Sequence, residues 1–421
     1  MKTLSTFLAV IFAISAYAHD AYTVIVNPGY NTSRCVRINW HSDIDTEKTY
    51  CFYTDCNDTE WEKAKKVKAK QELCTAFDSM YSKTASGENI YETPRFIRHS
   101  AELKGLTPDC NYMFRIGTSA KSGEIRYFKT APQSGEWTAG IISDFHAYTP
   151  LPKRVNSAME MIKTLERCNE GDFDMVLHVG DIIAWGGSYS FWKDLYTNEP
   201  FKKYLWAGVN GNHDNMDRTN KKNSNNFFRY TNNNPQNGYK GEKGVCYHFT
   251  YGNSLFIMLN NESMRSEEGL KEAQEWVKKV IKSHKNVKFI VVMEHYQWFY
   301  GTNGKSSQYE RWKILFDECG VDLAISANNH IYARTNAIYQ DKETDGNKGT
   351  VYIQTPSSDN ERGQELKEWT NNKDIIKFRW SEGARTVGAM LMKATDNELL
   401  LTLYDRNGNA IDNIIVKAKK R

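Results

Sequence analysis

The chain has 421 residues, enough for two domains with separate cores. Its 55 lysines and arginines nearly balance 51 aspartates and glutamates, and the net charge of +4 is not concentrated in a long basic block. The composition therefore gives no support for a nucleic-acid partner.

The first 18 residues have the pattern of a secretory signal peptide. One lysine precedes an apolar stretch from Leu4 to Ile14, and Ala16-Tyr17-Ala18 forms a small-x-small cleavage pattern before His19. A membrane anchor is the alternative, but this stretch is shorter than the roughly 20 residues that a spanning helix needs, and no later segment qualifies. We therefore expect an exported protein without a membrane span.

Eight cysteines leave the disulfide pattern open. Export permits disulfides, and both sequence groups hold an odd number, so either one bridge joins the two groups or two thiols stay free. A structural zinc site is disfavoured because the chain has no paired C-x-x-C motifs. The groups are Cys35, Cys51, Cys56, Cys74 and Cys110, and then Cys168, Cys246 and Cys319.

Residues 20–131 predict a small all-β domain. Short alternating runs such as TVIVN, CVRINW and YMFRIG are separated by turn residues, which favours an antiparallel sandwich. A lysine-rich stretch, residues 60–73, is interpreted as a solvated insertion or strand-edge loop. The segment LKGLTPDCNYMFRIG has the leucine, turn and tyrosine order of fibronectin type III-like modules. A polar stretch at 131–137 predicts a linker.

From Thr138 onward, strands alternate with helices, which is typical of a layered α/β domain. Apolar residues spaced for one helix face predict helices over 153–167 and 270–281. Buried-strand runs include AGIIS, DMVLHV, SLFIMLN, KFIVVM and VDLAIS. Asn407-Gly408 between two apolar runs predicts a closing β-hairpin.

Polar side chains follow five apolar runs of this second domain, at the point where each strand is expected to end. Because the carboxyl ends of parallel strands meet at one edge of a sheet, we expect these side chains to converge. Aspartate, asparagine and histidine suit first-row metals, and a shared carboxylate lets two ions lie about 3.5–4 Å apart. One such end would indicate only a turn or capping residue, but five in succession favour a metal centre. The residues are Asp144, His146, Asp181, Asn212, His213, His295, Asn329 and His330.

The order and spacing of these residues resemble the calcineurin-like metallophosphoesterases, and within them the purple acid phosphatase-like branch with an N-terminal fibronectin-like domain. The family motifs D-x-[GH], G-D-x-x-Y, G-N-H-[DE], V-x-x-H and G-H-x-H correspond here to residues 144–146, 180–184, 211–214, 292–295 and 327–330. The resemblance implies an α/β (α+β) fold, with a four-layer β-sandwich flanked by helices over 138–421. The small all-β sandwich over 20–131 precedes it.

The resemblance also implies a reaction and a set of site residues. Two metal ions, drawn from iron, zinc, manganese or magnesium, would activate a hydroxide that attacks a small phosphomonoester or diester. The first metal is expected on Asp144, His146, Asp181 and His330, with Asp181 bridging to a second metal held by Asn212 and His295 and by the position of Asn328. His213 is expected to donate a hydrogen bond or proton to the phosphoryl oxygen or the leaving group.

Two positions depart from the family motifs. Ala184 stands where purple acid phosphatases have the tyrosine that gives them colour, so we expect a colourless protein with His146 as a compensating ligand. Asn328 replaces the first histidine of G-H-x-H, and an amide oxygen is a poorer partner than imidazole for zinc or iron. The second site is therefore expected to be weakened or retuned, which leaves open a catalytically impaired relative that binds metal or phosphate. The substrate-orienting histidines that plant-type members carry after V-x-x-H are also missing.

Three other polar residues are not assigned to the site. His178 is interpreted as a hydrogen-bonded core histidine and His248 as a strand residue that faces solvent or sheet. Arg334 either contacts phosphate or forms a structural ion pair.

Overall fold

The computed structural model describes residues 21–78, 86, 92–120, 122–215, 226–299, 308–359, 361–366 and 374–420. The signal-peptide pattern at residues 1–18 lies outside these ranges. Within them, no helix is both long and apolar enough to cross a bilayer.

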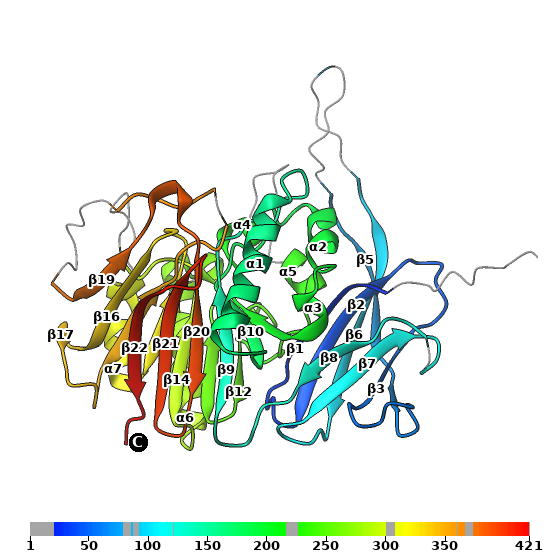
Figure 1. Cartoon of the computed structure of the whole chain (residues 1–421), viewed down its shortest axis with the longest axis horizontal. Helices are drawn as coiled ribbons and strands as arrows, with labels where there is room; N and C mark the ends of the chain where they lie inside the picture. The colour runs from blue at the N-terminus through cyan, green and yellow to red at the C-terminus, as the bar shows by residue number, and fades with distance from the viewer. Residues whose placement is uncertain are drawn as a thin grey trace, which may run out of the picture.

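Two large sheets pack face to face (Figure 1). The first has ten strands in the order β22-β21-β20-β9-β10-β11-β1-β2-β6-β5. These strands are β1 (Tyr22–Pro28), β2 (Cys35–Ser42), β5 (Lys70–Thr75), β6 (Arg95–Lys104), β9 (Trp137–Ile142), β10 (Met175–His178), β11 (Leu205–Gly208), β20 (Gly388–Ala394), β21 (Glu398–Asp405) and β22 (Ala410–Lys417).

The second large sheet has eight strands in the order β12-β13-β14-β15-β18-β16-β17, with β19 paired to β16. These are β12 (Tyr247–Tyr251), β13 (Ser254–Met258), β14 (Phe289–Met293), β15 (Leu323–Ser326), β16 (Tyr332–Tyr339), β17 (Lys342–Glu343), β18 (Thr350–Gln354) and β19 (Ile376–Trp380). A small third sheet has the order β4-β3-β7-β8. Its strands are β3 (Tyr50–Asp55), β4 (Lys65–Val67), β7 (Asn111–Gly117) and β8 (Arg126–Lys129).

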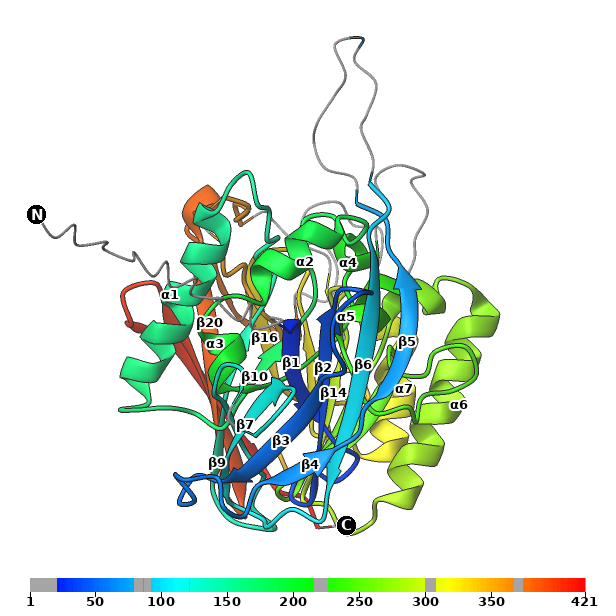
Figure 2. The same cartoon turned by 90° about the vertical axis from the view of Figure 1, so that its right-hand side faces the viewer.

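Alternating side chains place each large sheet between a shared core and a helical layer. In β14, Phe289, Val291 and Met293 pack into the core between the sheets, whereas Ile290 and Val292 pack with α6 and α7. Helices α1 to α3 cover the outer face of the ten-stranded sheet, and Figure 2 shows α1 and α6 on opposite sides of the molecule. The predicted four-layer α/β fold is therefore confirmed. The helices are α1 (Lys153–Cys168), α2 (Tyr189–Leu195), α3 (Pro200–Lys203), α4 (Asn212–Asn215), α5 (Asn226–Thr231), α6 (Glu267–Ser283) and α7 (Gln308–Cys319), with short 3-10 turns at Asn261–Met264 and Gly383–Arg385.

The ten-stranded sheet continues from the second half of the chain into the first. β1 pairs in parallel with β11, with Val26 opposite Leu205, and β2, β6 and β5 extend the sheet from there. The two halves are thus joined by main-chain hydrogen bonds. The lysine-rich stretch 60–73, interpreted as an insertion or strand-edge loop, contains β4 and most of β5, two largely exposed strands at sheet edges. Charge on an edge strand protects it from pairing with another chain.

The local predictions for the second half agree with the structure. The predicted helices correspond to α1 and α6, and Ser266 caps α6 by accepting a hydrogen bond from the N–H of Gly269. The Asn407-Gly408 hairpin is confirmed as the β21–β22 pair.

Neither expected cysteine arrangement is found. Both alternatives assumed disulfides, but all eight cysteines lie in the described residues and are free thiols. Sheet register explains part of this result, because Cys35, Cys51 and Cys74 lie opposite Lys104, Ile116 and Phe96 rather than opposite one another.

Candidate metal centre

Parallel strands in both large sheets bring the predicted ligands together. β9, β10 and β11 are parallel in one sheet, and β14, β15 and β18 are parallel in the other. The predicted site residues follow β9, β10, β11, β14 and β15, and Figure 1 shows α4 at the upper end of this region. Six of their side chains form three overlapping groups, within each of which the ligand atoms lie within 4.8 Å of one another. They are Asp144, His146, Asp181, His213, His295 and His330.

One oxygen of Asp181 lies at the middle of this cluster. Asp181 Oδ2 is 3.4 Å from His146 Nε2 and 3.2 Å from His295 Nε2. The other oxygen, Oδ1, accepts a hydrogen bond of 2.7 Å from the backbone N–H of His213. The carboxylate is therefore held with Oδ2 between imidazoles that come from different sheets, the arrangement a bridging ligand requires.

Asp144 is held in a similar way. Its Oδ2 accepts hydrogen bonds from Ser143 Oγ at 2.6 Å and from the backbone N–H of Asn328 at 3.3 Å. Its Oδ1 lies 3.4 Å from His330 Nε2 and 4.0 Å from His295 Nε2. Asp144 thus directs one oxygen toward the histidines and uses the other to hold the loop after β15.

All four histidines of the cluster are oriented through Nδ1. Each Nδ1 lies within hydrogen-bond distance of a backbone carbonyl, so each Nε2 is left for the centre. The pairs are His146 with Asp144 O at 2.9 Å, His213 with Ala184 O at 2.7 Å, His295 with Val179 O at 2.7 Å, and His330 with Arg362 O at 2.5 Å. Alanine at position 184 therefore offers no side-chain ligand, but its carbonyl orients His213.

The residues present fit metal ions. Within the described part of the chain, Asp144 Oδ1, His146 Nε2, His295 Nε2 and Asp359 Oδ2 are buried without a hydrogen-bond partner. An unpaired buried polar atom costs about 1–3 kcal/mol, so the convergence of several indicates a missing ligand. Ligand atoms bound to one cation at about 2.1 Å lie about 3–3.5 Å apart, and the 3.2–3.4 Å separations match this spacing.

The electrostatics of the centre favour cations. Burial opposes a charge on His295, but the carboxylates of Asp181 and Asp144 outweigh it and raise the pKa of His295 to about 10. Burial would also raise the pKa of Asp181, but its interactions with the imidazoles, above all with His295, hold it well below its usual value. The negative field that favours a proton on His295 equally favours a metal ion at that position.

Five of the predicted ligand positions have a left-handed backbone. A positive φ is uncommon for residues other than glycine and costs about 1–3 kcal/mol where it is held in place. The left-handed conformation turns the chain sharply after each strand and so directs the side chain to the shared edge of the sheet. The residues and angles are Asp144 (49°), His146 (44°), Asp181 (51°), Asn328 (68°) and His330 (57°).

Two predicted ligands are asparagines, and the structure places them differently. Asn212 is the first residue of α4, next to His213, and its role as a ligand stays a prediction. Asn328 Nδ2 donates a hydrogen bond of 2.6 Å to Gln297 Oε1. This bond leaves the amide oxygen, the metal-binding atom of asparagine, unused, and an amide oxygen is a weaker ligand for zinc or iron than the histidine of the family motif.

Two buried carboxylates support the centre and were given no role in the sequence analysis. Asp214 accepts hydrogen bonds from the N–H groups of Asp181, Ile183 and Gly211 at 2.8–3.0 Å, and so joins the loops after β10 and β11. Burial, and then the charge of Asp181, raise the pKa of Asp214 to about 7.

The second carboxylate, Asp359, follows β18, and its Oδ2 lies 3.5 Å from His146 Nδ1. Asp359 follows another apolar run, residues 350–354, but the parallel pairing of that strand with β15, which brings its carboxyl end to the same edge, is seen only in the structure.

The three polar residues that were not assigned to the site, Arg334, His178 and His248, lie outside the metal centre and contact other residues. Arg334 forms a two-point ion pair with Asp412, with Nε and Nη2 to carboxylate oxygens at 2.6 and 2.8 Å, so the structural alternative is confirmed. His178 is buried as expected, although its Nδ1 has no hydrogen-bond partner among the described residues. His248 is buried on β12 beside the ring of His284.

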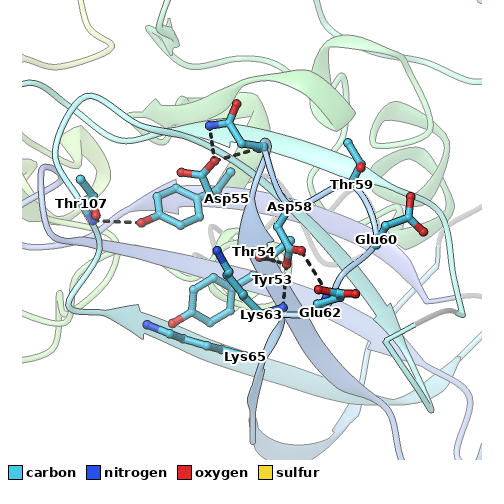
Figure 3. Close-up of a pocket in the computed structure, with 12 residues that line it drawn as sticks. Tyr53, Thr54, Asp55, Asp58, Thr59, Glu60, Glu62, Lys63, Lys65 and Thr107 are labelled. Atoms are coloured by element: carbon cyan, nitrogen blue, oxygen red, sulfur yellow. Dashed lines mark hydrogen bonds between the residues drawn. The ribbon is translucent and has the colours of Figure 1, made fainter.

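A cavity of about 650 Å³ lies in the first half of the chain, beside β3 (Figure 3). Several carboxylates line it, but those of Asp55 and Asp58 are already paired. Asp58 accepts hydrogen bonds from Thr54 Oγ1 and from the N–H groups of Glu62 and Lys63 at 2.6–3.1 Å, and Asp55 accepts one from the N–H of Asn57 at 2.8 Å. These acids stabilise a turn and leave no converging unpaired oxygens for a metal.

Comparison with protein families gives two matches along the chain. The calcineurin-like phosphoesterase family matches residues 138–332, and the N-terminal domain of purple acid phosphatases matches residues 22–130.

Two curated proteins of Arabidopsis thaliana are similar to the chain. One, named "Probable inactive purple acid phosphatase 27", is 22% identical over 379 residues, which are 76% of this chain and 57% of that protein. The other, named "Probable inactive purple acid phosphatase 1", is 24% identical over 311 residues, or 62% of this chain and 49% of that protein. The chain thus spans about half the length of the curated relatives it matches.

Solved structures show the same fold at low sequence identity. A purple acid phosphatase, PPD1, from yellow lupin (Lupinus luteus) seeds has a TM-score of 0.74 at 18% identity, over 96% of this chain and 75% of that chain. PhoD has a TM-score of 0.58 at 12% identity, over 95% of this chain and 94% of that chain. The chain therefore has a purple acid phosphatase N-terminal domain followed by a calcineurin-like phosphoesterase domain, and it shares its fold with a purple acid phosphatase.

Proposed function

We propose that the protein is a metal-dependent phosphoesterase that hydrolyses phosphomonoesters. The observation that supports this most directly is the position of Asp181 Oδ2, which lies 3.4 Å from His146 Nε2 and 3.2 Å from His295 Nε2. A single carboxylate oxygen between two imidazoles of different loops suits two cations close together. Two bound cations supply neutralisation of phosphoryl oxygens and a lowered pKa for an attacking water.

The ligands divide into two unequal sets. Asp181 belongs to both sets. The first set is composed of charged or imidazole groups, and it suits iron, zinc or manganese. The second set contains two amides, which suit harder ions such as magnesium or manganese better than zinc. The proposed sets are Asp144, His146, Asp181 and His330 for the first metal, and Asp181, Asn212, His295 and Asn328 for the second.

His213 is the group we assign to proton or hydrogen-bond transfer with the substrate. Its Nδ1 is taken by Ala184 O at 2.7 Å, so Nε2 is the atom available for substrate. Burial is the main cause that lowers the pKa of His213 below its ordinary value. The ring is therefore neutral near pH 7 and accepts a hydrogen bond at Nε2, whereas it donates a proton to a leaving group only in more acidic solution.

A second candidate is a catalytically impaired relative that binds metal or phosphate. The asparagine at position 328 favours it, because an amide oxygen is a poorer partner than imidazole for zinc or iron. Both curated relatives also carry names that call them inactive. The two candidates differ in metal content, since the enzyme requires about two ions per chain and the impaired relative holds one.

Activity and metal content test these alternatives together. Purified full chain is supplied with manganese, iron or zinc, its metal content is measured by elemental analysis, and hydrolysis of an aryl phosphate is followed. Asp181→Asn should abolish metal-dependent turnover. Asp405→Asn, which alters a buried carboxylate in the β21–β22 turn away from the centre, should leave turnover intact. Turnover no higher than that of Asp181→Asn, with one ion per chain, would favour the impaired relative.

We also propose that the protein is exported, on the apolar stretch and Ala-Tyr-Ala pattern of its first 18 residues. Expression of the full sequence with a secretory host should release a chain that begins at His19. A product retained in the cell with Met1 intact would contradict export.

A further inference from the structure

Arg362 is a charged residue whose backbone is fixed directly to the metal centre. It follows β18, and its carbonyl oxygen lies 2.5 Å from His330 Nδ1. Its N–H donates a hydrogen bond of 3.0 Å to Asp359 Oδ1, and the other oxygen of Asp359 lies 3.5 Å from His146 Nδ1. Both backbone contacts therefore lead to residues proposed to hold the first metal.

The Arg362 guanidinium has no partner among the described residues, unlike those of Arg154 and Arg334. In the described part of the chain, no carboxylate forms an ion pair with its guanidinium and no hydrogen bond from it is found. The adjacent Glu361 is paired instead with Lys153 and Arg154 at the start of α1. Arg334 is likewise paired, with Asp412. Arg362 is half-buried, so its charge is neither matched by protein nor fully dispersed in water.

Arg362 lies beside a row of three histidines. Its carbonyl contacts His330, whose ring centroid is 5.2 Å from that of His146, and the ring of His146 is in turn 4.8 Å from that of His213. The row therefore leads from Arg362 to His213, the residue proposed to meet the substrate.

We propose that Arg362 binds a terminal phosphoryl oxygen of the substrate and makes the site selective for phosphomonoesters over diesters. This inference rests on the proposed function. A guanidinium stays protonated and its planar fork matches the oxygens of phosphate. No described carboxylate forms an ion pair with the Arg362 guanidinium, and a bound phosphate would supply one.

The preference for monoesters follows from counting oxygens. A monoester has three terminal phosphoryl oxygens and a diester has two. If each of two cations takes one oxygen, only the monoester retains a terminal oxygen for Arg362. Arg362 would then take the place of the substrate-orienting histidines that are absent after His295.

Inorganic phosphate provides a test that does not depend on turnover. Titration calorimetry measures its binding to the manganese-loaded full chain and to Arg362→Gln, with metal content determined for each. A charge-assisted hydrogen bond of this kind contributes about ten- to hundredfold in affinity. Arg362→Gln should bind phosphate weaker by that factor with unchanged metal content, and Arg362→Lys should recover part of the loss. Arg385→Gln, the same change at an exposed arginine, should match the wild type.

The outcomes separate this inference from the proposed function. Where turnover exists, Arg362→Gln should lower kcat/KM for p-nitrophenyl phosphate more than for bis(p-nitrophenyl) phosphate. An unaltered phosphate affinity in Arg362→Gln with its metal retained would overturn the proposal. So would loss of metal from that variant, because it would show that Arg362 only supports His330. A wild type that binds phosphate through Arg362 without turnover would refute the phosphoesterase and leave the role of Arg362 standing.

Discussion

Alanine at Gly211 should disable the metal centre although Gly211 carries no ligand. A Cβ at this position would lie 2.2 Å from Asp181 Oδ1 and 2.4 Å from Asp181 N, so the two residues must separate by about 1 Å to reach ordinary contact. Asp181 cannot move alone, because its Oδ1 accepts from the N–H of His213 and its own N–H donates to Asp214. A misplacement of about 1 Å at a reacting centre costs roughly a hundredfold in rate.

Metal content and turnover of Gly211→Ala measure this effect. We expect loss of at least one ion per chain and a rate roughly a hundredfold below wild type. Gly320→Ala is the matched control, since Gly320 has a φ of +68° and a Cβ there would meet no described atom within 4 Å. It should cost about 1–2 kcal/mol of stability through backbone strain alone and keep its metal. Wild-type metal content and rate in Gly211→Ala would refute the view that this close contact holds the bridging carboxylate in place.

Four further outcomes are expected. Asn328→His should raise affinity for a second zinc or iron ion, and an unchanged ion count per chain would mean that position 328 does not face that metal. Because Ala184 offers no phenolate, iron-loaded protein should lack a tyrosinate absorption band in its visible spectrum. Asp359→Asn should lower first-metal affinity about 10- to 100-fold by removing the negative charge that lies 3.5 Å from His146 Nδ1, as measured by competition with a chelator. Burial lowers the pKa of His41 to about 3, so the contribution of neutral His41 to stability is present above the unfolded pKa of about 6.5 and is lost as pH falls toward 3. The free energy of unfolding should therefore drop by about 2 kcal/mol from pH 7 to pH 5 because of His41. His41→Gln should reduce this pH dependence when unfolding by urea is measured at both pH values.

The local parts of the fold were predictable because they depend on short-range periodicity. Alternating apolar residues located the strands that surround the site, and helical spacing located α1 and α6 to within a few residues. The rule that polar residues after parallel strands share one edge was sufficient to bring Asp144, Asp181 and His295 together.

Long-range pairing was the part that periodicity could not supply. Val26 and Leu205 pair across 178 intervening residues, and nothing in either strand's own sequence specifies the other. The same reason explains why Asp359 and Arg362 were missed. They follow β18, which becomes a neighbour of β15 only after the chain has returned through β16 and β17.

The two proposed metal sites differ in the ligands that the fold supplies, and this difference bears on whether the protein is an active enzyme or an impaired relative. In the first site, His146 is held by the Asp144 carbonyl and His330 by the Arg362 carbonyl, so its imidazoles are fixed before metal binds. In the second site, His295 is equally fixed by Val179 O, and Asn328 is held through the hydrogen bond from its Nδ2 to Gln297, with its amide oxygen unused by that bond. The amide oxygen of Asn328 is nevertheless a poorer partner than imidazole for zinc or iron, so the second site is the weaker one by its ligand chemistry. The first ion should therefore bind tightly and the second more weakly, so that occupancy of the second site, rather than loss of the fold, decides whether the protein acts as an enzyme.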